Sequence, residues 1–310
     1  MTPLVSVIIC THNPEPERLR RTFAALKAQT LPAPDWETLL VDNASTQPVA
    51  LGSYAGAAPG NVRILNEPWL GLSAARSRGL RESTAAVAVF VDDDNLLAPD
   101  YLTNVLAGFE RFPQVGLLGG RSLPTFEREP LPWHTEFLPL LALRDLGTKT
   151  ILSSGLRPPG ADRNQYPACA PIGAGMALRR ESWTPWLESY STLGVSDRRG
   201  SELSSAGDND IVFVAMKSGW EVGYCPELSL RHLIPATRLQ PHYLGRLNRG
   251  IQKSWAQVLA RHDASPWPPL THRGAALRKA RAYLTYRAWA GTRSYIRWQG
   301  ACGHFEGRIP

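Results

Sequence analysis

Residues 85–95 read Ala-Ala-Val-Ala-Val-Phe-Val-Asp-Asp-Asp-Asn, an apolar run that stops at three aspartates. A run that is apolar at nearly every position indicates a strand covered on both faces, as in parallel sheets. Three adjacent carboxylates repel one another, and a divalent cation would offset that repulsion. Oxygen ligands favour Mg²⁺ or Mn²⁺ over Zn²⁺. The alternative is a solvated acidic turn that caps the next helix, but the position directly after a buried strand favours a metal.

Short apolar runs alternate with helical patterns on both sides of this strand. Strands are predicted at 4–10, 37–41, 62–65 and 115–120, and helices at 18–29, 71–82 and 99–109. This alternation indicates βαβ units with right-handed crossovers. The predicted fold class is therefore α/β, a Rossmann-like, mostly parallel sheet flanked by helices.

Polar residues follow three of these strands at the point where each strand ends. They are Thr11-His12-Asn13, Asp42-Asn43 and Asp92-Asp93-Asp94. In open α/β sheets, ligands bind beyond the carboxyl ends of the strands. We therefore expect one ligand site along this rim.

The second half of the chain is less regular. Prolines punctuate residues 121–170, which predicts an irregular insertion, and a lid is one role for such a loop. Residues 171–178 are strand-like, 208–218 form a short helix and 220–224 a terminal strand. The predicted organisation is a catalytic domain over 1–240, with a nucleotide-binding half (1–120) and an acceptor half (121–240), followed by a helical tail over 241–310.

Composition narrows the class of protein. The chain has 310 residues, of which 43% are hydrophobic and 20% charged, so it can bury a core and is neither disordered nor fibrous. Its longest apolar runs are shorter than a membrane span. The four cysteines lie far apart without a CxxC pair, and the first apolar run is too short for a signal peptide. We expect a cytoplasmic protein, either free or on the cytoplasmic face of the membrane.

The net charge of +7 is concentrated in the tail. Residues 241–310 hold 12 Lys/Arg and two acidic residues, whereas residues 1–240 carry a net charge of −3. Arginines interleaved with Trp and Tyr suit an anionic membrane interface. The alternative is that the tail helices pack their aromatics on the body. A nucleic-acid partner is not expected, because the body is slightly acidic and its rim is acidic.

Six motifs, in this order, resemble those of family 2 glycosyltransferases with the GT-A fold. They are Val-Ser-Val-Ile-Ile-Cys-Thr-His-Asn at 5–13, Leu-Leu-Val-Asp-Asn-Ala-Ser-Thr at 39–46, Gly-Leu-Ser-Ala-Ala-Arg-Ser-Arg-Gly-Leu at 71–80, Asp-Asp-Asp at 92–94, Pro-Ile-Gly-Ala-Gly-Met-Ala-Leu-Arg-Arg at 171–180, and Gly-Asp-Asn-Asp-Ile at 207–211 with Gly219-Trp220, Pro226 and His232. Each motif alone is weak, but their order is specific. The resemblance implies sugar transfer from a nucleotide-sugar, with a UDP-sugar as the expected donor, to a hydroxyl of a glycan or lipid-linked acceptor, as in cell-envelope polysaccharide synthesis.

The resemblance also implies roles for residues of the rim. Asp42 would accept a hydrogen bond from a uracil N–H, and Arg76 would contact the uracil or the diphosphate. Asp94 would hold Mn²⁺ or Mg²⁺ against the diphosphate, with His232 as a metal or phosphate ligand. The other residues implied in nucleotide-sugar binding are Thr11, His12, Asn13, Asp92, Asp93, Gly173 and Gly175.

The implied reaction is a single displacement with inversion at the anomeric carbon. The resemblance places the catalytic base at Asp208, and Asp210 is a second candidate because Gly207 stands where the family commonly has Glu. Both carboxylates could instead only cap a helix N-terminus.

The sequence leaves two rival functions open. A sugar nucleotidyltransferase would need a Gly-rich loop with an Arg after the first strand, and residues 11–15 read Thr-His-Asn-Pro-Glu. The other rival is a non-enzymatic module that binds nucleic acid or membrane through its tail.

Overall fold

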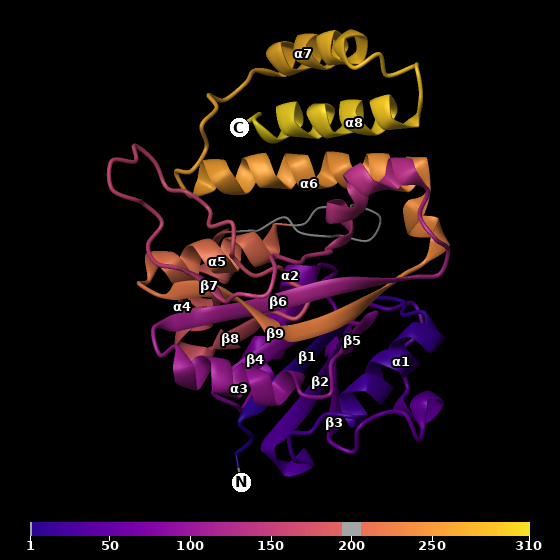
Figure 1. The fold of residues 1–310 in the computed structure, drawn as a ribbon, viewed down its shortest axis with the longest axis vertical. Helices are drawn as coiled ribbons and strands as arrows, with labels where there is room; N and C mark the ends of the chain where they lie inside the picture. The colour runs from indigo at the N-terminus through magenta and orange to yellow at the C-terminus, as the bar shows by residue number, and fades with distance from the viewer. Residues whose placement is uncertain (1, 194–205) are drawn as a thin grey trace.

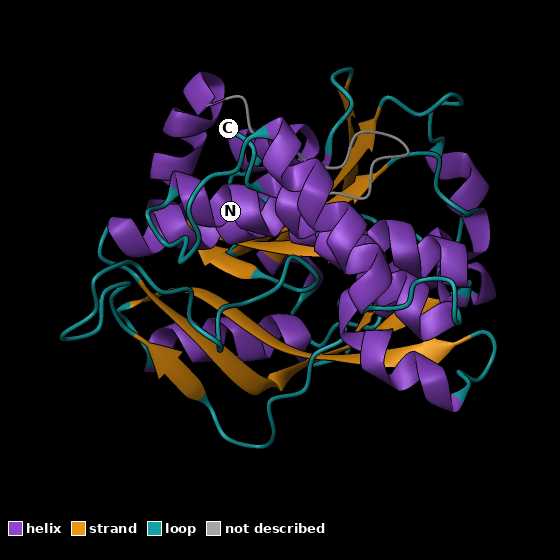
Figure 2. Cartoon of the chain, turned by 90° about the horizontal axis from the view of Figure 1, so that it is seen from above, coloured by secondary structure: helices purple, strands orange, loops and turns teal. Residues whose placement is uncertain are grey.

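The computed structural model describes residues 2–193 and 206–310. Within them, a nine-stranded sheet runs in the order β3-β2-β1-β4-β8-β6-β9-β5, and β7 pairs with β9 (Figure 1). The strands are β1 (Val5–Thr11), β2 (Trp36–Asn43), β3 (Val62–Glu67), β4 (Val87–Asp92), β5 (Asn95–Leu97), β6 (Val115–Phe126), β7 (Ile151–Ser153), β8 (Ala177–Arg179) and β9 (Glu221–Ile234). Strands β1 to β4 are parallel to one another, as predicted. The strand direction changes across the sheet in Figure 2, which is the twist expected of a large sheet.

Helices cover both faces of the sheet, as the continuously apolar strands predicted. The helices of the catalytic body are α1 (Pro16–Lys27), α2 (Leu72–Glu82), α3 (Tyr101–Arg111), α4 (Arg180–Leu193) and α5 (Gly207–Lys217). Val7 and Ile9 of β1 pack in one core with residues of α1 and α3. Ile8 between them points into a second core with residues of α2, α4 and α5. Alternate residues of one strand therefore serve two cores, which is possible only when helices lie on both sides.

Strands β6 and β9 are longer than the sequence predicted. The predicted ends were residues 120 and 224, but β6 continues to Phe126 and β9 to Ile234. The two extensions pair in parallel from Arg121↔Ser229 to Phe126↔Ile234, after a register shift near Gly120. A Cβ at Gly120 would lie 1.8 Å from the carbonyl oxygen of Leu228, so this close crossing needs glycine.

The prediction that residues 121–170 form an irregular insertion was therefore wrong for its first six residues. Proline normally disfavours a strand, but Pro124 lies inside β6, and its register partner in β9 is His232. The remainder contains the 3₁₀ helix η3 (Pro132–Leu141) and β7. The strand-like segment 171–178 is also mostly loop, because β8 begins only at Ala177.

The tail is helical, as predicted, and forms α6 (Pro241–Arg261), α7 (His272–Thr285) and α8 (Thr292–Gly307). Val258 and Leu259 of α6 share a core with α5, so α6 packs on the catalytic body. Helix α8 lies along α6, and α7 lies on the far side of α8 (Figure 1). A Cβ at Gly303 would lie 2.0 Å from the carbonyl oxygen of Arg249, so α8 approaches α6 closely. In the described part of the chain, every helix is too short or too polar to cross a membrane.

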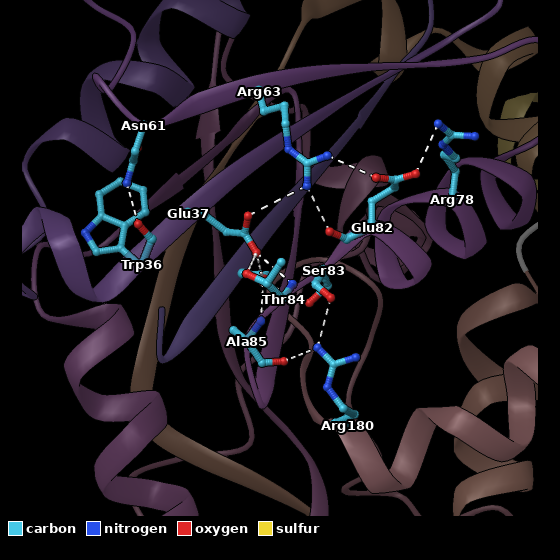
Figure 3. A network of polar contacts seen from close by, with 11 residues as sticks. Trp36, Glu37, Asn61, Arg63, Arg78, Glu82, Ser83, Thr84, Ala85 and Arg180 are labelled. Atoms are coloured by element: carbon cyan, nitrogen blue, oxygen red, sulfur yellow. Dashed lines mark hydrogen bonds and ion pairs between the residues drawn. The ribbon is translucent and has the colours of Figure 1, made fainter. Parts of the chain in front are cut away.

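A polar network joins the amino ends of the strands, at the opposite edge from the acidic rim (Figure 3). One carboxylate oxygen of Glu37 accepts hydrogen bonds from the Ser6 hydroxyl at 2.6 Å and from the N–H and hydroxyl of Thr84 at 2.8 Å each. Arg63 bridges Glu37 and Glu82, with N–O distances of 3.9 and 3.0 Å. The network connects β1, β2, β3 and the α2–β4 loop, so it fixes the strands from which the rim emerges.

Replacing Glu37 by Gln is expected to destabilise the fold in a pH-dependent way. Burial raises the pKa of Glu37, but the hydrogen bonds from Ser6 and Thr84 outweigh burial and hold it below its ordinary value of 4.5. Such a carboxylate stabilises the fold above that value and less as the pH falls through its folded pKa. We expect Glu37→Gln to lower the free energy of unfolding by about 2 kcal/mol at pH 7.

Urea unfolding from pH 7 down to pH 3 measures this effect, and the gap between variant and wild type should narrow with acidification. Glu82→Gln is the matched control, because Glu82 pairs with arginines at the surface and its loss should cost about 1 kcal/mol or less. A gap that stays constant with pH would contradict this role of the Glu37 charge.

Candidate active site

A cavity of about 250 Å³ lies where the carboxyl ends of β1 and β4 face η3 and α6. The sheet contributes the floor, and η3 and α6 contribute apolar walls. The lining residues are Cys10, Thr11, His12, Asn43, Leu70, Leu72, Ala75, Asp92, Asp93, Asp94, Leu140, Leu141, Ala142, His232, Arg238, Tyr243 and Leu247. The predicted ligand rim is thus one side of a cavity that the second half of the chain completes.

The acidic triplet occupies the floor of this cavity. Asp92 ends β4 beside Cys10 of β1, and the next two aspartates lie in the turn to β5. The Thr11 hydroxyl donates a short hydrogen bond to Asp93, and the Asn95 side-chain amide donates to Asp94 at 3.1 Å. The carboxylates are therefore oriented by neighbours, unlike those of a solvated acidic turn.

His232 reaches the triplet through sheet register. Strand β5 pairs antiparallel with β9, and Asn95 lies opposite His232. The Nε2 atom of His232 lies 3.3 Å from Oδ1 of Asp94, and both side chains are almost fully buried. His232 lies in the part of β9 beyond residue 224, so the extension of β9 is what places His232 beside Asp94.

Arg238, which the sequence did not single out, completes the cluster. It lies on the 3₁₀ helix η4 (Ala236–Leu239), directly after β9. Its guanidinium lies 2.8 Å from Oδ2 of Asp94 and 2.9 Å from Nε2 of His232. The guanidinium donates to the Asp94 carboxylate, because it has donors only, and Nε2 of His232 lies beside both partners.

The pKa values of Asp93 and Asp94 are shifted in opposite directions. Burial would raise the pKa of Asp94, but His232 and Arg238 outweigh burial and hold the pKa well below its usual range. Burial and the neighbouring charge of Asp94 raise the pKa of Asp93 to about 6. Asp94 is thus the fixed negative charge of the cavity.

The donor atoms of Asp94 and His232 fit a divalent cation. A carboxylate oxygen and an imidazole nitrogen lie 3.3 Å from each other, and Nδ1 of His232 is buried without a hydrogen-bond partner. Among the described residues, the structure contains no cluster of three or more His, Cys, Asp or Glu side chains arranged as a metal site. Two protein ligands suffice for Mg²⁺-type sites in which substrate phosphates and water fill the remaining positions.

The remaining rim residues fall into two groups. His12 lines the cavity and is exposed; its Nδ1 donates to the Asn43 carbonyl oxygen at 2.8 Å. Asn13 and Asp42 do not line the cavity. The Asn13 side chain accepts hydrogen bonds from Thr46 at 2.8 and 2.9 Å. The Asp42 carboxylate accepts from the backbone N–H groups of Ser45 and Val49, so in this structure both residues shape the loop after β2.

A second cluster brings together Arg76, Gly173 and Asp208. The Gly173 N–H donates to Oδ2 of Asp208 at 2.8 Å. A Cβ at Gly173 would lie 2.2 Å from the Arg76 guanidinium and 3.2 Å from the same Asp208 oxygen. Because Gly173 has no side chain, the Arg76 guanidinium of α2 and the Asp208 carboxylate of α5 can both lie close to its backbone. None of the three lines the cavity described above.

The two candidate bases differ sharply in environment. Asp208 is half-buried at the start of α5. Asp210 is completely buried; it accepts hydrogen bonds from Trp186 at 2.9 Å and from His262 at 2.8 Å. An acceptor hydroxyl cannot reach a carboxylate enclosed in this way. Gly175 is buried as well. Its φ is 75°, and its carbonyl oxygen accepts a hydrogen bond from the Tyr101 hydroxyl.

Three parts of the cavity were missed by sequence reasoning: Arg238, the η3 segment 140–142 and the α6 residues Tyr243 and Leu247. Arg238 follows His232 by six residues, and a cation so close to a proposed metal ligand was a signal. The apolar residues of η3 and α6 carry no such signal, because nothing in their types separates them from core residues.

Comparison with known proteins identifies the family. The model for glycosyl transferase family 2 matches residues 6–183. The succinoglycan biosynthesis protein ExoW of Rhizobium meliloti (strain 1021) is 32% identical over 112 residues, which cover 35% of this chain and 34% of ExoW. Glycosyltransferase AglE of Haloferax volcanii is 36% identical over 94 residues, or 30% of this chain and 31% of AglE. These matches span about a third of each relative.

Solved structures share the fold over nearly the whole chain. A mannosyltransferase from Pyrobaculum calidifontis, PcManGT, in complex with GDP-Man and Mn²⁺, aligns with a TM-score of 0.59 and 18% identity, covering 98% of this chain and 87% of that one. S. aureus TarS 1–349 in complex with UDP-GlcNAc aligns with a TM-score of 0.54 and 14% identity, covering 98% and 90%. The sheet flanked by helices is that of the GT-A fold. The family match covers more than half of the residues, so the chain belongs to glycosyl transferase family 2.

Proposed function

We propose that this glycosyltransferase transfers a sugar from a nucleotide-sugar, with inversion at the anomeric carbon, to a hydroxyl of a glycan or lipid-linked acceptor. The observation that carries the proposal is the cavity cluster of Asp94, His232 and Arg238 at the end of β4. This cluster presents one carboxylate, one imidazole and one guanidinium, a set that suits a metal-bound diphosphate.

A UDP-sugar is the proposed donor. PcManGT was crystallised with GDP-Man and Mn²⁺ and TarS with UDP-GlcNAc, so related folds accept nucleotide-sugars. In this chain, exposed His12 beside Thr11 at the cavity edge offers a surface for a base, and Asp42 keeps its proposed role toward uracil. To bind Asp42, the uracil would have to compete with the two backbone N–H groups from which the Asp42 carboxylate accepts hydrogen bonds in this structure.

Asp94 and His232 are the proposed ligands of Mn²⁺ or Mg²⁺. When bound, the cation would act as a Lewis acid on the diphosphate as negative charge develops there. Arg238 adds a second positive charge on the same side of the cavity and is proposed to contact the diphosphate. Asp92 and Asp93 are proposed to orient the ribose or the sugar through hydrogen bonds.

Asp208 is the proposed catalytic base. It would take the proton of the acceptor hydroxyl while the sugar–phosphate bond breaks, and the single displacement inverts the anomeric carbon. The Gly173 N–H holds one carboxylate oxygen of Asp208 in place, and the Arg76 guanidinium lies beside the same glycine. A lipid-linked acceptor would lie at a membrane surface, and we propose that the enzyme is peripheral there.

A screen of donors tests the function directly. The protein is incubated with UDP- and GDP-sugars, with Mn²⁺ or EDTA, and both the unfolding temperature and the release of nucleoside diphosphate are measured. The matching donor should stabilise the fold by about 2.7 kcal/mol at 100 times its Kd, and only with the cation. The free nucleoside monophosphate is the control, since it lacks the diphosphate and should give a smaller shift. No stabilisation by any donor would contradict the proposal.

A further inference from the structure

The outermost helix of the tail exposes its apolar side chains. Leu277 is 73% exposed, Leu284 64% and Trp289, just after α7, 57%. Ala275 and Ala282 of α7 are buried. Each leucine follows a buried alanine by two residues and so lies about 200° around the helix from it. The leucines thus lie on the opposite side of α7 from the buried alanines, and their exposure belongs to the fold and not to a frayed end.

This face carries positive charge and no carboxylate. Residues 264–305 contain seven Lys/Arg and no Asp or Glu. Four of the arginines on α7 and in the turn after it are exposed and, among residues 2–193 and 206–310, form no ion pair with a carboxylate. These four are Arg273, Arg278, Arg281 and Arg287. We call the three apolar residues and these four arginines the α7 face.

Aromatic packing joins the α7 face to α8. The Tyr283 ring lies 5.4 Å from Trp289 and 5.3 Å from Trp298 of α8, between ring centroids. The Trp298 indole N–H donates to the Lys279 carbonyl oxygen at 3.2 Å. An open groove of about 540 Å³ beside this cluster is lined by Tyr283, Leu284 and Trp298. The face is therefore preformed, with an apolar groove at its edge.

We propose that the α7 face docks on an anionic lipid bilayer. Leucine and tryptophan side chains between unpaired arginines match the apolar boundary and the negative headgroups of such a surface. The charge argues against a second copy of this chain as the occupant, because two such faces would repel each other. Helix α8 lies between α7 and α6 (Figure 1), and the cavity is lined by Tyr243 and Leu247 of α6 and not by α7. Docking through α7 therefore leaves the cavity open to its substrates.

Vesicle co-sedimentation of the full chain without nucleotide tests the proposal. The probes are vesicles of phosphatidylcholine alone and vesicles that also contain phosphatidylglycerol. The protein should bind only the second kind, and ionic strength near 0.5 M should weaken binding. Leu277→Ser with Leu284→Ser, and separately Arg278→Glu with Arg281→Glu, should each weaken binding about tenfold or more.

Matched controls separate the α7 face from general stickiness. Leu4 is an exposed leucine at the opposite end of the molecule, and Arg81 and Arg111 are exposed arginines of the body. Leu4→Ser, and Arg81→Glu with Arg111→Glu, should bind vesicles as the wild type does. Unfolding temperatures of all variants should agree, because every changed side chain is exposed.

Three results would overturn the proposal: no binding to anionic vesicles, equal binding by the α7-face and control variants, or a lipid-free dimer that dissociates on Leu277→Ser with Leu284→Ser. The last result, read by sedimentation velocity, would assign the face to self-association. The docking proposal rests on the peripheral location proposed above, and the assay tests that location. Because the assay contains no donor, failure to bind vesicles would leave the proposed sugar transfer standing, and failure of the donor screen would leave the docking standing.

Discussion

Replacing Asp208 by Asn should lower the turnover of sugar transfer by about 10²–10⁴-fold, the usual contribution of a positioned base. An amide cannot take the proton of the acceptor hydroxyl. It can still accept the hydrogen bond from the Gly173 N–H, so the loop and the donor site should keep their shape. Donor affinity, measured by calorimetry with Mn²⁺, should therefore change by no more than about twofold.

Asp210→Asn is the matched control, because it makes the same chemical change two residues away on the same helix. Asp210 is enclosed by Trp186, His262 and Arg261, and loss of its charge should lower the free energy of unfolding by about 3 kcal/mol. The folded fraction should retain turnover. Asp208 is not the base if Asp208→Asn turns over normally, or if Asp210→Asn alone loses turnover while remaining folded.

Replacing Asp94 by Asn should remove the dependence of donor binding on the cation. In the structure, Asp94 offers its two oxygens to His232 and Arg238, and it is the carboxylate with the strongly lowered pKa. Loss of this charge should weaken donor binding in Mn²⁺ by about 100-fold or more, equivalent to about 2.7 kcal/mol. Titration of the matching donor with Mn²⁺ and with EDTA measures both the donor affinity and its dependence on the cation.

Asp100→Asn is the control for Asp94→Asn, since it removes the same charge from an exposed position at the start of α3. It should bind the donor as the wild type does, with and without Mn²⁺. Equal affinities of the wild type in Mn²⁺ and in EDTA would refute the metal role of Asp94 before any variant is made.

The sequence alone predicted the strands that build the rim. The apolar runs before Thr11, Asp42 and Asp92 are parallel neighbours in the sheet, because a continuous apolar run has few ways to be buried except between two layers of helices. Motif order indicated the family, which the match over residues 6–183 confirmed. The extensions of β6 and β9 could not be predicted. Pro124 and Pro226 are residues that normally disfavour a strand, and the two strands that pair are far apart in the sequence.

By itself, then, the sequence determined which side chains stand at the ends of strands, since that depends on local hydrophobic pattern. Only the tertiary structure decided which of them meet. The register of β5 against β9 brings His232 and Arg238 to Asp94, and burial separates half-exposed Asp208 from enclosed Asp210. Both outcomes depend on contacts between distant segments, and such contacts leave no periodic trace in the residues that make them.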